Sequence, residues 1–283
     1  MREIVIISGK GGTGKTTVTS AFASLAKNKV MADCDVDAAD LHLILKPDIK
    51  HREDFRSGKK AYIRQQDCID CGKCIEVCQF DAISDDYVVD PISCEGCGVC
   101  VYFCPVDAID FNEVVSGEWF ISETRFGPLV HAKLGIAEEN SGKLVSLVRR
   151  QAKLLAEEKK LDYIIVDGSP GVGCPVISSI TGADAVLIVT EPTLSGVHDL
   201  ERVVNLSKGH FGINTYVCVN KYDLNEEITN EIEKFCNEND VTFAGKIPYD
   251  TEVTAAMVEE KNVIEYSDGR VAESVRSIWE RLK

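Results

Sequence analysis

The chain has 283 residues, of which 45% are hydrophobic and 27% are charged, a composition that suits a large α/β core with a small additional module. Its formal net charge of −15 argues against nucleic acid or anionic lipid as a partner, because both are bound by clustered Lys and Arg. No apolar run approaches the roughly 18 residues of a membrane span, and no secretory signal follows Met1. We therefore expect a cytoplasmic protein without a membrane or nucleic-acid partner.

Apolar strands alternate with helical stretches along most of the chain. The opening strand "EIVIIS" is continuous and β-branched, as a buried parallel strand requires. The predicted strands cover 3–8, 29–37, 161–171, 184–192 and 214–223, and the predicted helices cover 15–28, 140–159, 197–208 and 225–239. This alternation predicts an α/β fold with a parallel sheet and helices on both faces.

A glycine-rich loop lies between the first strand and the first helix. Residues 9–16 read G-K-G-G-T-G-K-T and match the phosphate-binding pattern G-x-x-x-x-G-K-[ST]. Its glycines let backbone N–H groups approach phosphates, Lys15 is expected to contact the β and γ phosphates, and the Thr16 hydroxyl is expected to ligate Mg²⁺. A flexible glycine turn is the plain alternative. The predicted nucleotide-binding residues of the loop are Gly11, Gly12, Thr13, Gly14, Lys15, Thr16 and Thr17.

Twelve cysteines in such a chain indicate metal or redox chemistry rather than disulfides. Eight of them form two copies of C-x₂-C-x₂-C-x₃-C, the spacing of bacterial two-cluster ferredoxins, in which the fourth cysteine of each copy ligates the other cluster. The alternatives are that the cysteines bind zinc, or that the bound clusters have a purely structural role. The predicted ligands are Cys68, Cys71, Cys74 and Cys104 for one [4Fe–4S] cluster, and Cys94, Cys97, Cys100 and Cys78 for the other.

The second copy has the expected proline after its last cysteine, Pro105, whereas the first copy has Gln79 in that place. We expect this departure to alter loop geometry or cluster potential and not ligation. The cysteine-dense stretch 60–111 interrupts the alternation of strands and helices, which indicates a small α+β insertion. The following segment 117–134 is expected to return to the main sheet as a pair of strands.

The second lysine of the loop, Lys10, makes the motif K-G-G-T-G-K-T resemble the deviant P-loop of the MinD/ParA/Mrp class, which includes the nitrogenase iron protein. Together with the cysteine repeats, the whole chain resembles ATPases of this class with an inserted two-[4Fe–4S] ferredoxin domain. The resemblance implies a discontinuous P-loop ATPase domain at 1–59 and 112–283, and a ferredoxin domain at 60–111. It also implies that Lys10 reaches the partner's nucleotide across an ATP-sandwich dimer; an ordinary solvated lysine is the alternative.

The resemblance implies further site residues. Asp167 ends the strand "YIIVD", where the class places the carboxylate that holds a Mg²⁺-bound water, and "GSPGVG" after it would sense the γ-phosphate. Asp35 matches the position that orients the attacking water, although other aspartates lie close by. Asn220 and Pro248 match the places that contact adenine; each is otherwise an ordinary turn residue. The implied catalytic residues are Lys10, Lys15, Asp35 and Asp167.

Two features remain outside these motifs. Cys174 lies seven residues after Asp167, the distance at which the nitrogenase iron protein has a cluster-ligating cysteine, but no second cysteine completes such a site, and a packing role is favoured. The tail carries an apolar stripe at helical spacing, for which packing on the sheet is favoured over membrane binding. The stripe consists of Val271, Val275, Ile278, Trp279 and Leu282.

The function implied by the sequence is that of an ATP-hydrolysing iron–sulfur protein with ATP or ADP, Mg²⁺ and two [4Fe–4S] clusters as cofactors. ATP-dependent closure of a homodimer, or of a heterodimer with a related chain, would be coupled to electron transfer to a redox partner. One alternative is an assembly or carrier ATPase that delivers clusters to an acceptor protein, like Mrp. The other is a positioning switch in the manner of MinD.

Overall fold

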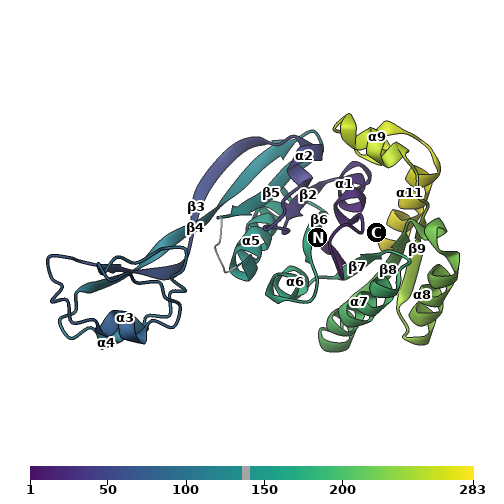
Figure 1. The fold of residues 1–283 in the computed structure, drawn as a ribbon. Coiled ribbons are helices and arrows are strands. Elements are labelled where there is room, and N and C mark those ends of the chain that lie inside the picture. Colours follow the sequence, from purple (N-terminus) through teal and green to yellow (C-terminus); the bar gives the residue numbers. More distant parts are fainter. Residues whose placement is uncertain (136–140) are drawn as a thin grey trace. The chain divides into compact units, whose positions relative to one another are not determined.

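The computed structural model describes residues 1–135 and 141–283 (Figure 1). The chain divides into two compact units. The large unit comprises Met1–Glu53, Trp119–Lys133 and Ser141–Lys283. The cysteine-rich unit comprises Asp54–Glu118 and a short segment that starts at Leu134. Residue 140, the first of a predicted helix, lies outside the described residues.

A nine-stranded sheet has the order β3-β4-β5-β2-β6-β1-β7-β8-β9. Neighbouring strands run parallel from β5 through to β9. The connection between β4 and β5 contains only Arg125 and Phe126, so these neighbours form an antiparallel hairpin. The bounds are Arg2–Ser8 (β1), Lys29–Asp33 (β2), Asp48–Ile63 (β3), Ile109–Thr124 (β4), Gly127–Leu134 (β5), Tyr163–Pro170 (β6), Ala185–Thr190 (β7), Asn214–Asn220 (β8) and Thr242–Ile247 (β9).

The predicted parallel sheet is therefore found from β5 to β9, and the sheet is antiparallel between β4 and β5. A strand that returns through a two-residue turn cannot cross over the sheet, and only a long crossover allows a parallel neighbour. The predicted strand pair at 117–134 is confirmed, as the last part of β4 and as β5. The central strands are buried on both faces, which explains their continuous apolar sequence.

Helices cover both faces of the sheet of the large unit (Figure 1). The helix α11, from Arg270 to Leu282, packs its apolar stripe against α1 and β9, and the Trp279 ring lies 5.1 Å from the ring of Phe22. All five residues of the stripe are buried, so the packing interpretation is confirmed. The other helices are α1 (Lys15–Leu25), α2 (Leu41–Leu45), α5 (Ser141–Lys159), α6 (Cys174–Ile180), α7 (Leu194–Val204), α8 (Glu226–Glu238), α9 (Glu252–Val258) and α10 (Val263–Tyr266). None of the helices in the described ranges has the length and apolar character of a membrane crossing.

The cysteine-rich unit repeats its backbone as well as its sequence. Its two helices, α3 (Lys73–Val77) and α4 (Val99–Phe103), pack together and each follows a left-handed glycine, Gly72 with φ 73° and Gly98 with φ 74°. Three residues after the last cysteine of each motif, Asp81 and Asp107 also share a left-handed conformation, with φ 51° and 53°. The two copies therefore share their backbone conformation at these equivalent positions.

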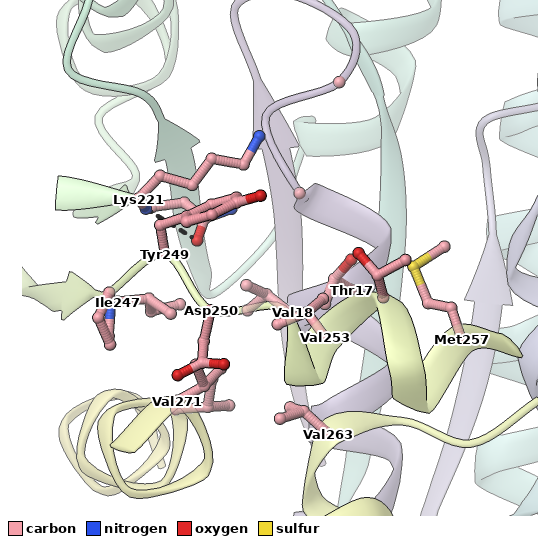
Figure 2. Close-up of a pocket in the computed structure, with 16 residues that line it drawn as sticks. Thr17, Val18, Lys221, Ile247, Tyr249, Asp250, Val253, Met257, Val263 and Val271 are labelled. Atoms are coloured by element: carbon pink, nitrogen blue, oxygen red, sulfur yellow. Dashed lines mark hydrogen bonds between the residues drawn. The ribbon is translucent and has the colours of Figure 1, made fainter. Parts of the chain in front are cut away.

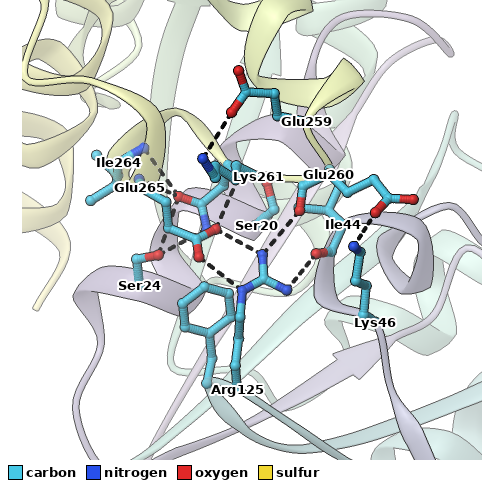
Figure 3. Close-up of polar contacts among 12 residues, drawn as sticks. Ser20, Ser24, Ile44, Lys46, Arg125, Glu259, Glu260, Lys261, Ile264 and Glu265 are labelled. Carbon is cyan, nitrogen blue, oxygen red and sulfur yellow. Dashed lines mark hydrogen bonds and ion pairs between the residues drawn. The ribbon is translucent and has the colours of Figure 1, made fainter.

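Arg125, in the β4–β5 turn, joins three parts of the large unit (Figure 3). Its guanidinium donates to the carbonyl of Ile44 in α2 at 2.8 Å, to the carbonyl of Glu260 at 3.2 Å, and to both carboxylate oxygens of Glu265 at 2.8 Å. Glu265 also closes a capping box with Asn262 at the start of α10. These contacts fix α10 relative to the sheet.

His131 on β5 is buried, with its Nε2 atom 2.9 Å from the hydroxyl of Ser122 and its ring stacked on Phe120 at 4.9 Å. Burial lowers the pKa of His131 to about 4. In the unfolded chain a histidine titrates near its usual value of about 6.5. Between these two values the unfolded state binds a proton that the native state does not bind, so native stability falls as the pH falls.

We expect His131→Gln to remove a pH-dependent loss of roughly 3 kcal/mol between about pH 6.5 and pH 4. Urea unfolding at several pH values in this window measures it. The exposed residue His198 supplies the control variant, His198→Gln, which should retain the wild-type dependence. If His131→Gln showed the same slope as the wild-type protein, the buried neutral imidazole would not be its source.

Candidate functional site

The glycine-rich loop leads from β1 into α1 in a conformation that only glycine adopts without strain. Gly12 and Gly14 have φ values of 81° and 91°, and a Cβ at Gly14 would lie 2.3 Å from the side-chain nitrogen of Asn220. That nitrogen donates to the carbonyl of Thr13 at 2.8 Å. The Thr13 hydroxyl is buried and has no partner among the described residues. The loop therefore presents backbone groups and an unused hydroxyl at the N-terminus of α1, the arrangement that binds phosphate.

Lys15 and Asp167 form the centre of a buried polar cluster. The ammonium of Lys15 lies 2.9 Å from Asp167 and 3.3 Å from Asp35. Burial disfavours the charged lysine, but the attraction of Asp167 and Asp35 outweighs it, and the pKa of Lys15 is raised. Thr16 and Thr19 donate their hydroxyls to Asp167, each at 2.8 Å. Four residues predicted separately from the sequence thus meet at one place: Lys15, Thr16, Asp35 and Asp167.

Asp33 was not assigned a role from the sequence. Its carboxylate is fully buried and accepts the N–H groups of Asp35 at 3.2 Å and Leu41 at 3.3 Å, which fixes the loop that carries Asp35. Burial, together with the charge of Asp167, raises its pKa well above the usual value. Burial also raises the pKa of Asp35. The site therefore concentrates carboxylates that favour an arriving cation.

Oxygen atoms dominate the cluster, as Mg²⁺ prefers. Across residues 1–135 and 141–283, no three His, Cys, Asp or Glu side chains converge closely enough to hold a single metal ion. In nucleotide sites Mg²⁺ is usually held by one or two protein oxygens together with waters and phosphate oxygens. The hydroxyl of Thr16 and the carboxylate of Asp167 are the groups that fit this task.

Lys10 lies apart from the Lys15 cluster and contacts the loop that precedes α7 and the first turn of that helix. Its ammonium is 3.1 Å from the hydroxyl of Ser195, 3.4 Å from that of Thr193 and 3.8 Å from the carboxylate of Glu191. Glu191 also pairs with Lys221 at 2.6 Å. Within a single chain Lys10 thus has partners of its own.

A cavity of about 240 Å³ opens beside the glycine-rich loop (Figure 2). The predicted residues Asn220 and Pro248 line it together with Gly12, Gly14 and Thr17. Most of the remaining lining is apolar and comes from α9, α10 and α11, none of which was predicted to contribute. These residues include Val253, Met257, Val263, Val271 and Val275, and Tyr249 lines the cavity beside Pro248. An apolar cavity next to a phosphate loop is suited to a flat nucleotide base.

The cysteine-rich unit contains two small cavities that are each lined by four cysteines. The first is lined by Cys68, Cys71, Cys74 and Cys104, and the second by Cys78, Cys94, Cys97 and Cys100. In each cavity three cysteines come from one repeat and the fourth from the other. All eight are free thiols.

The remaining cysteines line neither of these cavities. Cys34, Cys218 and Cys236 are buried, and burial raises the pKa of Cys218 and Cys236 to about 12, which suits packing residues. Cys174 is exposed at the start of α6. The exposure of Cys174 contradicts the expectation that it is a buried packing residue.

Residues 4–263 match the family of CobQ/CobB/MinD/ParA nucleotide-binding domains. The MJ0578 protein of Methanocaldococcus jannaschii is 38% identical over 286 residues, which cover 99% of this chain and 96% of that protein. The iron-sulfur cluster carrier protein of Pyrococcus abyssi is 29% identical over 153 residues, 48% of this chain and 51% of that protein. The structure of the septum site-determining protein MinD of Pyrococcus horikoshii, complexed with Mg-ADP, superposes with a TM-score of 0.62 at 20% identity and covers 100% of this chain and 96% of that one. The chain therefore belongs to the CobQ/CobB/MinD/ParA family of P-loop ATPases.

Proposed function

We propose that this ATPase couples ATP-dependent dimer closure to electron transfer through two [4Fe–4S] clusters in its cysteine-rich unit. The proposal rests on the two cavities of the cysteine-rich unit. Each cavity is lined by three cysteines of one repeat and by the fourth cysteine of the other repeat. In this proposal residues 1–59 and 112–283 form the ATPase domain, and residues 60–111 form the ferredoxin domain. The redox partner would be a separate protein.

The residues of the Lys15 cluster would change partners when ATP binds. Lys15 would leave Asp167 for the β and γ phosphates, and Thr16 and Asp167 would hold Mg²⁺. When bound, Mg²⁺ neutralises negative charge on the phosphates. Asp35, held by Asp33, lies 3.3 Å from Lys15 and orients the attacking water. Asn220 and Pro248 contact the adenine in the adjoining cavity.

Lys10 would supply the link to the dimer. It leaves Glu191, Thr193 and Ser195 of its own chain and reaches the nucleotide of the partner. ATP shifts the equilibrium between open and closed dimers only by the difference between its affinities for the two states. A lysine that contacts phosphate only in the closed state provides such a difference.

The lining of each cysteine cavity provides four thiols, as a [4Fe–4S] cluster needs, and its other lining groups also suit such a cluster. Each combines thiols with an apolar lining, from Ile63 and Ile109 in one and from Ala61 and Ile83 in the other. The N–H group of Ala108 donates to the Cys104 sulfur at 3.3 Å. Hydrogen bonds to sulfur and an apolar surround are the means by which a protein sets cluster potentials. When bound, the clusters would supply one-electron redox chemistry.

The test is electron transfer from the anaerobically reconstituted and reduced protein to a protein acceptor, with and without MgATP. We expect MgATP to change the rate for the wild-type protein and to leave it unchanged for Lys15→Ala. If MgATP acted equally on both proteins, or on neither, the coupling would be absent. Iron and sulfide analysis of each sample shows separately whether the clusters are present.

A carrier of iron–sulfur clusters is the second candidate, supported by the likeness to the carrier protein of Pyrococcus abyssi. It predicts that the reconstituted protein loses its iron to an apo-ferredoxin, whereas an electron carrier retains it. A positioning switch is the third candidate, supported by the fold shared with MinD. It predicts nucleotide-dependent binding to lipid vesicles or to a filament.

A further inference from the structure

The two repeats of the cysteine-rich unit provide an internal comparison, because equivalent positions share one backbone conformation. The exposed positions of α3 are charged, with Lys73 directly after Gly72 and Glu76 three residues later. The equivalent positions of α4 are Val99 and Tyr102, both exposed. A repeated cysteine motif does not by itself require the charged residues of α3 to be replaced by apolar ones in α4. The second repeat has an apolar outer surface where the first has a charged one.

This surface, which we call the α4 face, consists of Val99, Tyr102 and Phe103. Their exposed fractions are 39%, 84% and 47%, and the rings of Tyr102 and Phe103 are in edge contact at 5.2 Å. The position equivalent to Phe103 is Val77, which is only partly exposed. A tyrosine that is 84% exposed buries little of its apolar ring within this unit. Exposed aromatic groups of this kind are typical of protein interaction sites.

The α4 face adjoins the edge of one cysteine cavity. Val99 lines the second cavity next to Cys97 and Cys100, and Cys97 is exposed. A protein bound to this face would therefore lie close to the sulfur of Cys97. The position equivalent to Val99 is Lys73, which lines the first cavity and ends in a charged ammonium group instead of an apolar one.

The charge of the unit indicates what kind of protein fits. Residues 54–118 contain thirteen Asp and Glu against five Lys and Arg, a formal net charge of −8. Two of these acids, Glu95 and Asp107, flank the α4 face in sequence and are exposed. An apolar centre with an acidic surround complements a partner with an apolar recess and a rim of Lys and Arg.

We propose that the α4 face is the docking site for a basic redox protein, which exchanges electrons with the cluster held by Cys94, Cys97, Cys100 and Cys78. This inference rests on the proposed function, because it requires that cluster. Tyr102 would act as the central contact, since interface tyrosines in an apolar recess contribute strongly to binding. The acidic surround would speed encounter through long-range attraction.

The test uses the reconstituted, reduced protein and cytochrome c as a basic protein acceptor, with the rate of electron transfer measured by stopped flow. Tyr102→Glu gives the α4 face the charge of the first repeat, and Tyr62→Glu is the matched control. Tyr62 is 66% exposed on β3, outside both repeats. We expect Tyr102→Glu to lower the second-order rate constant about tenfold, and Tyr62→Glu to leave it unchanged or slightly raised.

The comparison separates contact from charge, because both variants add one negative charge and would steer a basic acceptor slightly better. Equal rate constants for the two variants would overturn the docking site. So would sedimentation showing that Tyr102→Glu dissociates a dimer, because the α4 face would then bind a second copy.

Iron content and the reduction of a small neutral dye are measured for every variant. If the wild-type protein held no iron or failed to reduce the dye, the proposed function would fail, and the docking site with it. If dye reduction is normal and only the cytochrome c rate falls in Tyr102→Glu, the docking site is supported. A fall in both rates for Tyr102→Glu would indicate a damaged cluster and would overturn it.

Discussion

We expect Lys15→Ala to lower the rate of ATP hydrolysis about 10³-fold. The ammonium of Lys15 is the buried cation that lies closest to Asp167, at 2.9 Å, and phosphoryl transfer depends on positioned charge more than on covalent chemistry. A steady-state phosphate-release assay with MgATP measures the effect. Lys27→Ala is the control, because Lys27 is also a lysine of the segment after the loop but is exposed. A loss of less than tenfold would place the hydrolytic site elsewhere.

The same substitution should also lower the stability of the nucleotide-free protein. Asp167 is 1% exposed and would lose its cation while Thr16 and Thr19 continue to donate hydrogen bonds to it. Removing one partner of a buried ion pair typically costs about 3 kcal/mol or more. Urea unfolding with and without Mg²⁺ measures this cost. We expect Mg²⁺ to restore part of it, because the cation replaces the missing positive charge beside Asp167.

The central part of the fold could be predicted because its signals are local. The strand before the glycine-rich loop is continuously apolar, and the loop's glycines require the left-handed backbone found at Gly12 and Gly14. A sequence motif that fixes both a strand and the start of a helix also fixes the place where they meet. Lys15 and Thr16 could therefore be placed correctly before any tertiary contact was known.

The apolar side of the nucleotide cavity could not be predicted in the same way. Val253, Met257 and Val263 belong to short helices whose apolar residues are too few to show a periodicity. Val263 lines the cavity because α10 is held by contacts between distant segments, such as Arg125 with Glu265. The role of Asp33 was missed for a related reason. Asp33 accepts hydrogen bonds from backbone N–H groups, and every residue type except proline can supply such a group, so the sequence does not reveal these contacts.

The cysteine cavities could be predicted only in part. The spacing of three cysteines is a local signal, whereas the fourth cysteine of each cavity comes from the other repeat. Three cysteines separated by two residues each occupy one turn of chain around a helix start, as at Gly72 and Gly98. The fourth cysteine follows the helix and has moved away from the first three. Two equivalent repeats that pack through α3 and α4 can therefore exchange their fourth cysteines. Single substitutions cannot test this exchange. Loss of any one cysteine removes one cluster, whether the fourth cysteines are exchanged or each repeat holds its own cluster.

Two double variants distinguish the arrangements. In the exchanged arrangement Cys78 and Cys94 line the same cavity, so Cys78→Ser with Cys94→Ser should lower the iron content from about eight to about four atoms per chain. Cys68 and Cys78 line different cavities, so Cys68→Ser with Cys78→Ser should remove nearly all of the iron. If each repeat held its own cluster, the two results would be reversed.

Iron analysis after anaerobic reconstitution measures both variants, and the intact P-loop provides the control for folding. Because the nucleotide site lies in the large unit, a correctly folded double variant should still bind ATP with wild-type affinity. Equal iron contents in the two double variants would contradict both arrangements and would favour sites that hold something other than two cubane clusters. The comparison therefore tests the ligand pairing and the identity of the clusters in the same experiment, without relying on the ATPase or on any partner protein.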